Sequence, residues 1–209
     1  MLQLTRPVVG FLAVLILCTS AVRSSAAVYN GPGGPLVDDP GEGWGTAEFP
    51  ITISGTGATV QSVNAVVLTN LTHTWIGDMQ LTLLAPDGTL ERLASPRDAE
   101  NSNFNGTYTF IVDPSVPTLD EATEPLGDGD DLPSQSLAIA TYGFGPNGPR
   151  TTYDVFDNKP LDGTWTLRIE DFGVGDTGAL GAWSLDVTVP EPAIGSLGVL
   201  ALFALRRRR

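Results

Sequence analysis

The sequence contains almost no cysteine: Cys18 is the only one among 209 residues. It lies in an N-terminal stretch that we expect to be removed, so the mature domain is predicted to contain neither a disulfide nor a thiolate metal site. Leu17 is larger than the small residue that usually precedes a lipid-modified cysteine, which argues against a lipoprotein. Catalysis by cysteine is excluded as well. Stability must come from packing, hydrogen bonds or bound ions.

Histidine and basic residues are scarce too. His73 is the only histidine, so a Ser-His-Asp hydrolase would depend on this one residue. A packed, hydrogen-bonded structural role is the better interpretation of His73. From Asp38 to Glu191 the chain carries 24 acidic and five basic residues, a net charge of −19. Such a surface repels nucleic acid and anionic lipid and favours cations as partners, although acidity can also serve solubility alone.

Charged residues make up only 17% of the chain, whereas glycine (24) and proline (16) are plentiful. This composition is typical of many short strands joined by turns, and the length suits one domain. Alternating apolar residues predict strands over residues 49–54, 60–72, 79–84, 89–93, 107–112, 137–141, 164–170 and 180–189. Within 60–72 the predicted inward positions are Val63, Ala65, Val67, Thr69 and Leu71. We therefore predict an all-β fold, a β-sandwich of jelly-roll type, with an N-terminal signal helix and a C-terminal apolar helix outside the domain.

The N-terminal residues have the pattern of an export signal. Arg6 precedes an apolar stretch, and small residues lead up to Ala27, so we predict a signal peptide over 1–27 that signal peptidase removes. Residues 28–44 are rich in glycine, proline and acid and are predicted to form a flexible arm before a domain over 45–189. A polar excursion over 113–135 is long for a compact domain and is expected to be either functional or mobile.

The C-terminal residues 190–209 combine three parts: Pro190-Glu191-Pro192, an uncharged apolar run over 193–205, and Arg206, Arg207, Arg208 and Arg209. A helix of this run would span about 20 Å, which is short of the roughly 30 Å hydrocarbon core, so a plain membrane anchor is the weaker alternative. The arrangement resembles a PEP-CTERM sorting signal. That resemblance implies an exosortase-type processing enzyme, transient membrane association, and delivery to the envelope, outer surface or extracellular matrix of a Gram-negative-type bacterium.

Several runs in the centre of the chain resemble the P (Homo B) domain of proprotein convertases and of many bacterial secreted proteins. They are His73-Thr74-Trp75-Ile76-Gly77-Asp78, the turn from Ala85 to Thr89, Gly163-Thr164-Trp165-Thr166-Leu167 and the segment from Gly178 to Leu185. The resemblance covers roughly residues 45–189 and implies a β-sandwich of jelly-roll type. It also implies structural roles for the motif residues His73, Thr74, Trp75, Gly77, Pro86, Gly88, Gly163, Trp165 and Trp183. A P domain normally accompanies a subtilisin-like catalytic domain, for which this chain has no room.

Calcium is the cofactor that the acidic residues favour, because it takes six to eight hard oxygen ligands. Asp78, Asp171 and Asp176 lie in glycine-bearing loops beside predicted strands, and Asp113 is a weaker addition. The resemblance points the same way, since bacterial P domains often bind calcium. The run from Asp128 to Asp131 resembles half of an EF-hand loop but lacks the downstream glutamate, so a solvated acidic loop is predicted there.

Trp75, Trp165 and Trp183 could line a sugar platform, but their places in alternating strands favour the core, whereas Trp44 lies outside that pattern. Our first hypothesis is an exported, non-catalytic, calcium-stabilised P-domain module that acts as a structural, adhesive or matrix component. The alternatives are a binding module for polysaccharide, or an accessory domain for a separate subtilisin-like secreted protease. A carboxylate-based hydrolase ranks last, because nothing in the sequence selects one pair of acids.

Overall fold

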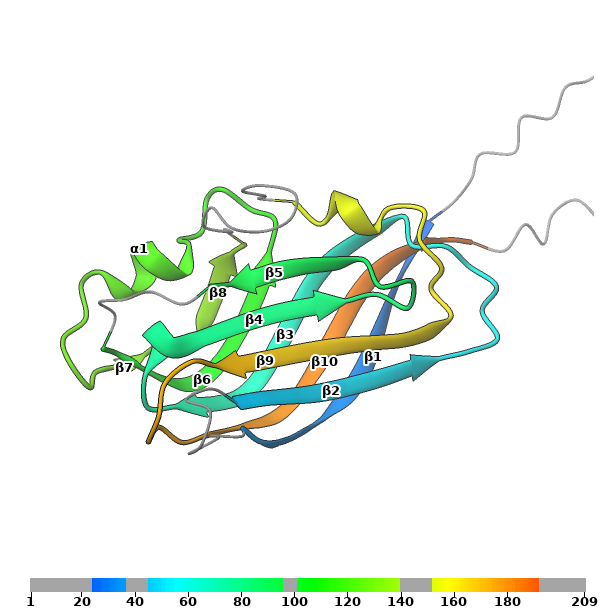
Figure 1. Ribbon diagram of the computed structural model, residues 1–209. Coiled ribbons are helices and arrows are strands. Elements are labelled where there is room, and N and C mark those ends of the chain that lie inside the picture. Colours follow the sequence, from blue (N-terminus) through cyan, green and yellow to red (C-terminus); the bar gives the residue numbers. More distant parts are fainter. Residues whose placement is uncertain (1–23, 37–44, 96–100, 140–151, 192–209) are drawn as a thin grey trace, which may run out of the picture.

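The computed structural model describes residues 24–36, 45–95, 101–139 and 152–191, and these form two β-sheets packed face to face (Figure 1). The six-stranded sheet contains β1 (Ser24–Pro35), β10 (Gly178–Pro190), β3 (Ser62–His73), β6 (Asn103–Ile111), β7 (Asp131–Leu132) and β8 (Gln135–Ala138). The four-stranded sheet contains β2 (Gly45–Ile53), β9 (Gly163–Asp171), β4 (Met79–Leu84) and β5 (Leu90–Ala94). Three single-turn helices lie in the connections, η1 (Ile76–Asp78), α1 (Leu119–Thr123) and η2 (Asp154–Phe156).

The strand order is that of a jelly roll. The two sheets run β1-β10-β3-β6 and β2-β9-β4-β5, and every neighbouring pair among these eight strands is antiparallel. β7 and β8 lie beside β6 and run parallel to it. The predicted all-β sandwich is therefore confirmed, and its two layers form a double Greek key.

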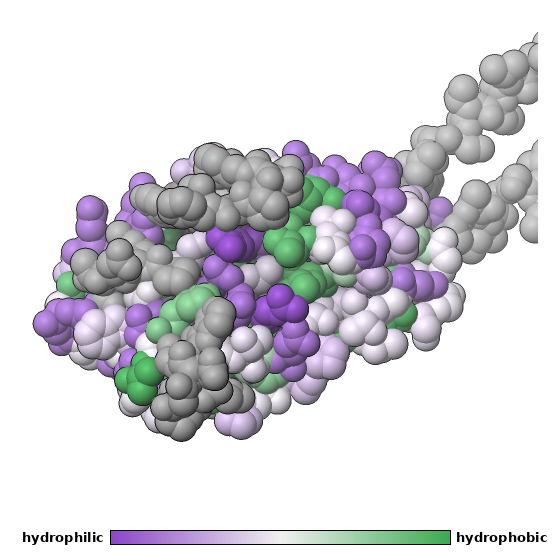
Figure 2. All heavy atoms as spheres, viewed as in Figure 1, coloured by the Kyte–Doolittle hydropathy of each residue, from purple (hydrophilic) through white to green (hydrophobic). Residues whose placement is uncertain are grey.

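The core lies between the sheets and follows the alternation in the sequence. β2 alternates buried and exposed residues along its whole length, and β4 turns Met79, Leu81 and Leu83 fully inward, as predicted. Trp165 and Trp183 are completely buried, one from each sheet. Where Figure 2 shows this side of the molecule uncovered by grey atoms, residues of intermediate and hydrophilic character predominate and apolar residues lie in small groups.

The inward face of β3 differs from the prediction. Val63, Val66, Leu68 and Leu71 are buried, whereas Ala65, Val67 and Thr69 are only partly buried. The register shifts once opposite Asp186 and Val187 and again between Leu68 and Leu71, where Asn70 has a φ of 51°. Each β-bulge adds one residue and reverses the alternation beyond it, so a strict period of two gives the wrong phase in the middle of β3.

The predicted flexible arm is wrong for residues 28–35, because they belong to β1, which pairs with β10 along its length. The glycines of this segment allow close packing: a Cβ on Gly31 would overlap the Trp183 indole, and one on Gly33 would overlap the Leu180 carbonyl. Residues 37–44, Trp44 included, lie outside the described residues. The predicted signal peptide lies outside them up to residue 23, while Ser24 to Ala27 form the first part of β1.

Ser24 pairs with Pro190, so the beginning of β1 and the end of β10 lie at the same end of the sandwich (Figure 1). Of the predicted sorting tail, Pro190 ends β10 and Glu191 follows it, while Pro192 and Arg206 to Arg209 lie outside the described residues. Within the described ranges, no helix combines the length and the apolar character that a membrane crossing requires.

Residues 113–135 are not a structureless excursion. α1 begins with a capping box in which the Thr118 hydroxyl accepts from the Glu121 N–H and the Glu121 carboxylate accepts from the Thr118 N–H. β7 then joins the six-stranded sheet at the edge of β6. The segment is therefore part of the fold, fixed by the cap and by its pairing with β6.

Candidate functional site

A buried histidine and carboxylate join two loops at the end of the sandwich opposite Ser24 and Pro190. His73 ends β3, Asp171 ends β9, and His73 Nε2 lies 3.0 Å from Asp171 Oδ2. The residues are 1% and 2% exposed. The other oxygen of Asp171 accepts a hydrogen bond from the Gly173 N–H at 3.0 Å. One carboxylate thus holds both the histidine and the turn that follows β9.

The histidine is not arranged as a general base. Its Nδ1 faces the backbone of Trp75, 2.8 Å from the carbonyl oxygen and 3.2 Å from the nitrogen. A neutral ring can accept the Trp75 N–H, whereas a protonated ring can donate to the carbonyl. Both ring nitrogens are therefore engaged within the fold, which leaves none to take a proton from a serine. The predicted structural role of His73 fits this geometry.

Two more carboxylates reach the same place from the neighbouring loops. A Cβ built on Gly173 would overlap Asp78 Oδ2 and would lie 3.3 Å from Asp176 Oδ2, so both side chains converge over this glycine. Asp176 Oδ1 accepts from the Thr74 hydroxyl at 2.7 Å, and the Asp78 carbonyl accepts from the Phe172 N–H at 2.9 Å. Burial, followed by repulsion from Asp171 and Asp176, raises the pKa of Asp78.

This arrangement partly fits a calcium ion. Asp78 and Asp176 supply hard oxygens to one point. Burial and then repulsion from Asp171 and Asp176 raise the pKa of Asp78, and a cation would relieve the repulsion. Among the described residues, however, no group of three or more histidine, cysteine, aspartate or glutamate side chains meets the geometry of a metal site. Backbone carbonyls and water would have to complete the coordination. Calcium binding therefore stays a prediction.

Asp113 does not belong to this cluster. It follows β6, whose end lies beside Ala65 of β3, whereas His73 lies beside Phe104 at the start of β6. Asp113 Oδ1 accepts from the Ser115 N–H at 2.8 Å, and hydrogen bonding to Ser115 lowers its pKa. The structure therefore brings together Asp78, Asp171 and Asp176 and places Asp113 at the other end of the sandwich.

The remaining motif residues are structural, with one exception. Gly77 is buried in η1, Gly88 has a φ of 85° in the turn between β4 and β5, and Gly163 packs against the ring of Pro86. Trp165 is buried and donates from Nε1 to the Leu161 carbonyl at 3.0 Å. Trp75 is 37% exposed, so its predicted place in the core is wrong: it follows the end of β3 and precedes η1.

The acidic run from Asp128 to Asp131 is not simply solvated. Asn101 donates to Asp128 at 2.7 Å and Asn105 donates to Asp131 at 2.7 Å. Between them, Asn103 donates to the Gly129 carbonyl at 2.9 Å and reaches Asp131 at 3.4 Å. Amide donors on alternate residues therefore fix this acidic loop against β6. The alternating asparagines in the sequence were the available signal, and sequence reasoning missed it.

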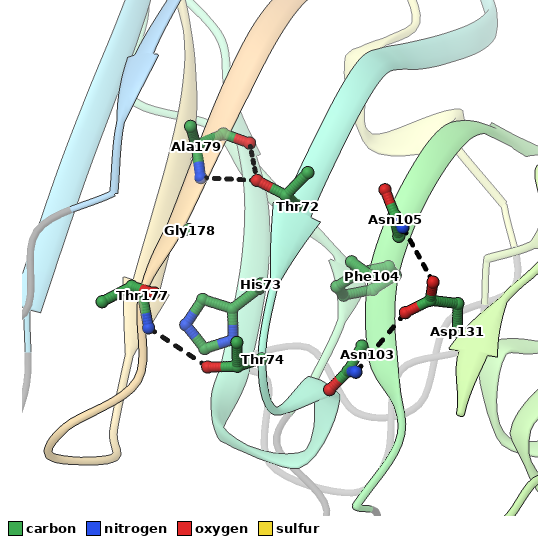
Figure 3. Close-up of a pocket in the computed structure, with 10 residues that line it drawn as sticks. All are labelled: Thr72, His73, Thr74, Asn103, Phe104, Asn105, Asp131, Thr177, Gly178 and Ala179. Carbon is green, nitrogen blue, oxygen red and sulfur yellow. Dashed lines mark hydrogen bonds between the residues drawn. The ribbon is translucent and has the colours of Figure 1, made fainter. Parts of the chain in front are cut away.

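A polar groove of about 480 Å³ lies beside this loop, at the ends of β10, β3, β6 and β7 (Figure 3). His73, Phe104, Gly178 and Ala179 are among its lining residues. Its polar lining comes from Thr72, Thr74, Asn103, Asn105, Asp131 and Thr177. In Figure 3, Asn103 and Asn105 point toward Asp131 from one strand, while Thr72 faces Ala179 across the neighbouring pair.

Comparison with known proteins finds similarity to larger proteases. The chain is 25% identical over 140 residues to the transglutaminase-activating metalloprotease of Streptomyces mobaraensis, covering 67% of this chain and 12% of that protein. The serine protease of Aeromonas sobria, solved in complex with a chaperone, is 17% identical with a TM-score of 0.40, over 79% of this chain and 28% of that one. The same protease solved by itself gives 18% and 0.36, over 78% and 27%. The chain thus spans about an eighth of the length of the curated relative.

The family comparison covers just over half of the chain. The proprotein convertase P-domain matches residues 62–124 and 142–187, which include β3, β4, β5, β6, β9 and most of β10. The matched segments contain the buried His73–Asp171 pair, the turn at Pro86 and both core tryptophans. The chain belongs to the proprotein convertase P-domain family.

Proposed function

We propose that the chain is a non-catalytic accessory module for a separate secreted protease of the subtilisin type. P domains are companion domains of such proteases, and the similar metalloprotease, of which this chain covers 12%, is a much longer protein. The observation that carries the proposal is the His73–Asp171 pair. The single histidine of this chain is buried, with both ring nitrogens engaged in holding two loops together, which suits a stabilising module and not a catalytic centre.

The loops that this pair joins also offer a surface for a protein partner. Trp75, Phe172 and Val174 are 37%, 38% and 61% exposed, and all three lie on the two loops tied together by His73 and Asp171. Large apolar side chains exposed on rigid loops are typical anchors of protein interfaces. We propose that these three residues contact the protease.

Export, sorting and calcium belong to the same proposal. The leader would direct secretion, and the PEP-CTERM-like tail would be processed by an exosortase-type enzyme and deliver the domain to the envelope or matrix, where it could also act as a structural or adhesive component. Calcium held by Asp78 and Asp176, with backbone carbonyls and water completing its coordination, would offset the repulsion among these carboxylates and Asp171. The position of Pro190 supports this arrangement, because the tail follows the end of β10 that lies opposite the motif loops, and these loops would point away from the membrane while the tail is attached.

Co-purification from culture medium tests the proposal. The full chain, tagged and produced in its own bacterium, is expected to bring down a subtilisin-like protease and to hydrolyse no peptide alone. Val174→Ser should weaken the association, while Val112→Ser should not, since Val112 is also exposed (46%) but lies beyond the far end of β6. Recovery of no protease, or equal recovery with both variants, would contradict the proposal.

A further inference from the structure

We infer that the polar groove beside the acidic loop is a binding site for neutral polysaccharide. The inference does not depend on the proposed protease contact, although Thr74 and Thr177 of the groove lie on the same two loops as Trp75 and Val174. The groove volume of about 480 Å³ lies within the roughly 300–1,000 Å³ typical of small-molecule sites. It lies on the outer face of the six-stranded sheet, where its floor and walls are built on strands and on the fixed loop before β7.

The groove presents hydrogen-bond acceptors to which no described residue donates. Asn103 and Asn105 donate through Nδ2 to the acidic loop, so their Oδ1 atoms are left without a donor in the described part of the chain. Asp131 receives one amide at each carboxylate oxygen and retains further lone pairs. The Thr177 hydroxyl makes no hydrogen bond to any described residue, so it can both donate and accept. Together these groups match the closely spaced hydroxyls of a sugar.

The polar groups are also held in position before a ligand arrives. The Thr72 hydroxyl is fixed against the backbone of Ala179, accepting at 3.1 Å and donating at 3.3 Å. The Thr74 hydroxyl accepts from the Thr177 N–H at 3.2 Å and thereby fixes the backbone of Thr177. Pre-positioned polar groups reduce the ordering cost of binding. Between them Gly178 and Ala179 leave a shallow apolar floor on which the C–H face of a sugar ring can lie.

A basic peptide is the competing ligand, because the domain is strongly acidic, but the groove fits it less well. Asp131 is the only charged side chain of the lining, and two amides already donate to it. A lysine or arginine side chain would pair with the Asp131 carboxylate and would leave the hydroxyls and amide carbonyls of the other strands without a hydrogen-bond partner from the ligand. A chain of neutral sugars can form hydrogen bonds with all of these hydroxyls and amide carbonyls.

Affinity electrophoresis of the full chain in gels containing dextran, galactomannan or xylan tests the inference. At least one glycan should retard the protein, and about 0.5 M NaCl should leave the retardation unchanged, because a neutral ligand has no charge to screen. Ala179→Leu should fill the floor of the groove and weaken binding by about tenfold or more. Ser184→Leu is the matched control, since Ser184 is another partly exposed outward residue of β10 but does not line the groove.

A milder variant keeps the test informative if Ala179→Leu fails to fold. Thr177→Val preserves shape and removes only the unused hydroxyl, so it should weaken binding about threefold to tenfold, as expected for one hydrogen bond. Retardation by none of the three glycans would overturn the inference. So would unchanged retardation in Thr177→Val, or binding only to a lysine-rich peptide that disappears in high salt.

Discussion

His73 Nε2 lies 3.0 Å from Asp171 Oδ2, in a place where neither side chain is open to solvent. Removing one partner of a buried pair leaves the other without its hydrogen bond, so the cost exceeds that of an exposed contact. Asp171→Asn should lower the free energy of unfolding by about 2 kcal/mol or more. Urea unfolding measures this value.

A double-mutant cycle with His73→Gln separates the pair from its surroundings. The coupling energy between the two positions should be about 1–3 kcal/mol, because the side chains are in direct contact. Asp113→Asn is the control: its carboxyl lies at the other end of the sandwich, so the substitution should leave stability nearly unchanged. Additive effects of Asp171→Asn and His73→Gln would show that the contact does not hold the two loops together.

Calcium should stabilise the protein through Asp78. At a calcium concentration about ten times the Kd, the free energy of unfolding should rise by about 1.4 kcal/mol. Asp78→Asn should abolish this rise and should slightly stabilise the calcium-free protein, because burial and the charges of Asp171 and Asp176 disfavour the ionised carboxyl in the fold.

Thermal unfolding with calcium and with a chelator measures both effects. Asp113→Asn is again the control, and it should respond to calcium as the wild-type protein does, since Asp113 lies at the other end of the sandwich. An equal rise in Tm for Asp78→Asn and the wild type would rule out Asp78 as a ligand.

The sequence predicts the regular strands well because one periodic pattern decides each of them. β9 buries every second residue without interruption, and in β4 apolar residues alternate with Gln80 and Thr82, which are buried as well, so alternation alone places Trp165 and Leu81 in the core. β3 contains two bulges, and no local signal announces where each extra residue lies. β1 was mistaken for an arm because its glycines and prolines are typical of loops, whereas here glycine permits close packing on β10.

For the candidate site too, some residues can be predicted from the sequence and others cannot. Asp78, Asp171 and Asp176 could be selected from the sequence because each follows or precedes a strand in a glycine-bearing loop, and the strand ends meet in the sandwich. The groove could not be predicted, because Asn105 and Asp131 meet only through the pairing of β6 with β7, across 25 intervening residues. The prediction of Trp75 in the core fails because alternation does not continue past the end of β3.

Deleting β1 tests whether the N-terminal segment belongs to the domain. A truncated chain that begins at Gly45 loses the strand that pairs with β10 from Ser24–Pro190 to Pro35–Ala179. We expect such a chain to lose about 3 kcal/mol or more of stability, or to lose cooperative unfolding. A chain that begins at Ser24 is the control and should unfold as the full chain does. Equal stability of both truncated chains would instead support the prediction that this segment is a flexible arm.

Gly163 should tolerate no side chain. Its φ is 129°, and a Cβ would lie 2.5 Å from Cβ of Pro86, so strain and overlap act together. Gly163→Ala should cost about 2–4 kcal/mol of unfolding free energy. Gly175→Ala is the matched control, because Gly175 has a φ of 98° but open space around it, and it should cost only about 1 kcal/mol. Equal costs would mean that the contact with Pro86 contributes nothing.

Asp87 should make the turn between β4 and β5 sensitive to acid. The hydrogen bond from the Lys159 ammonium, 2.8 Å away, lowers the pKa of Asp87 to about 2, with help from the Thr89 N–H. A carboxyl whose pKa is lower in the folded state than its ordinary value of 3.8 contributes stability that is complete above that value and is lost as the pH falls toward about 2. Since both side chains are about one-third exposed, the contribution should be only about 0.5 kcal/mol.

Urea unfolding of the wild type and Asp87→Asn at about pH 6 and about pH 2.5 measures this contribution, because the difference in stability between the two proteins should shrink at the lower pH. Lys159→Gln should reduce the pH dependence without abolishing it, since the Thr89 N–H still donates to Asp87. High salt should weaken the effect of Lys159 in the wild type. A constant difference between wild type and Asp87→Asn at both pH values would show that the ionised form of Asp87 does not stabilise the turn.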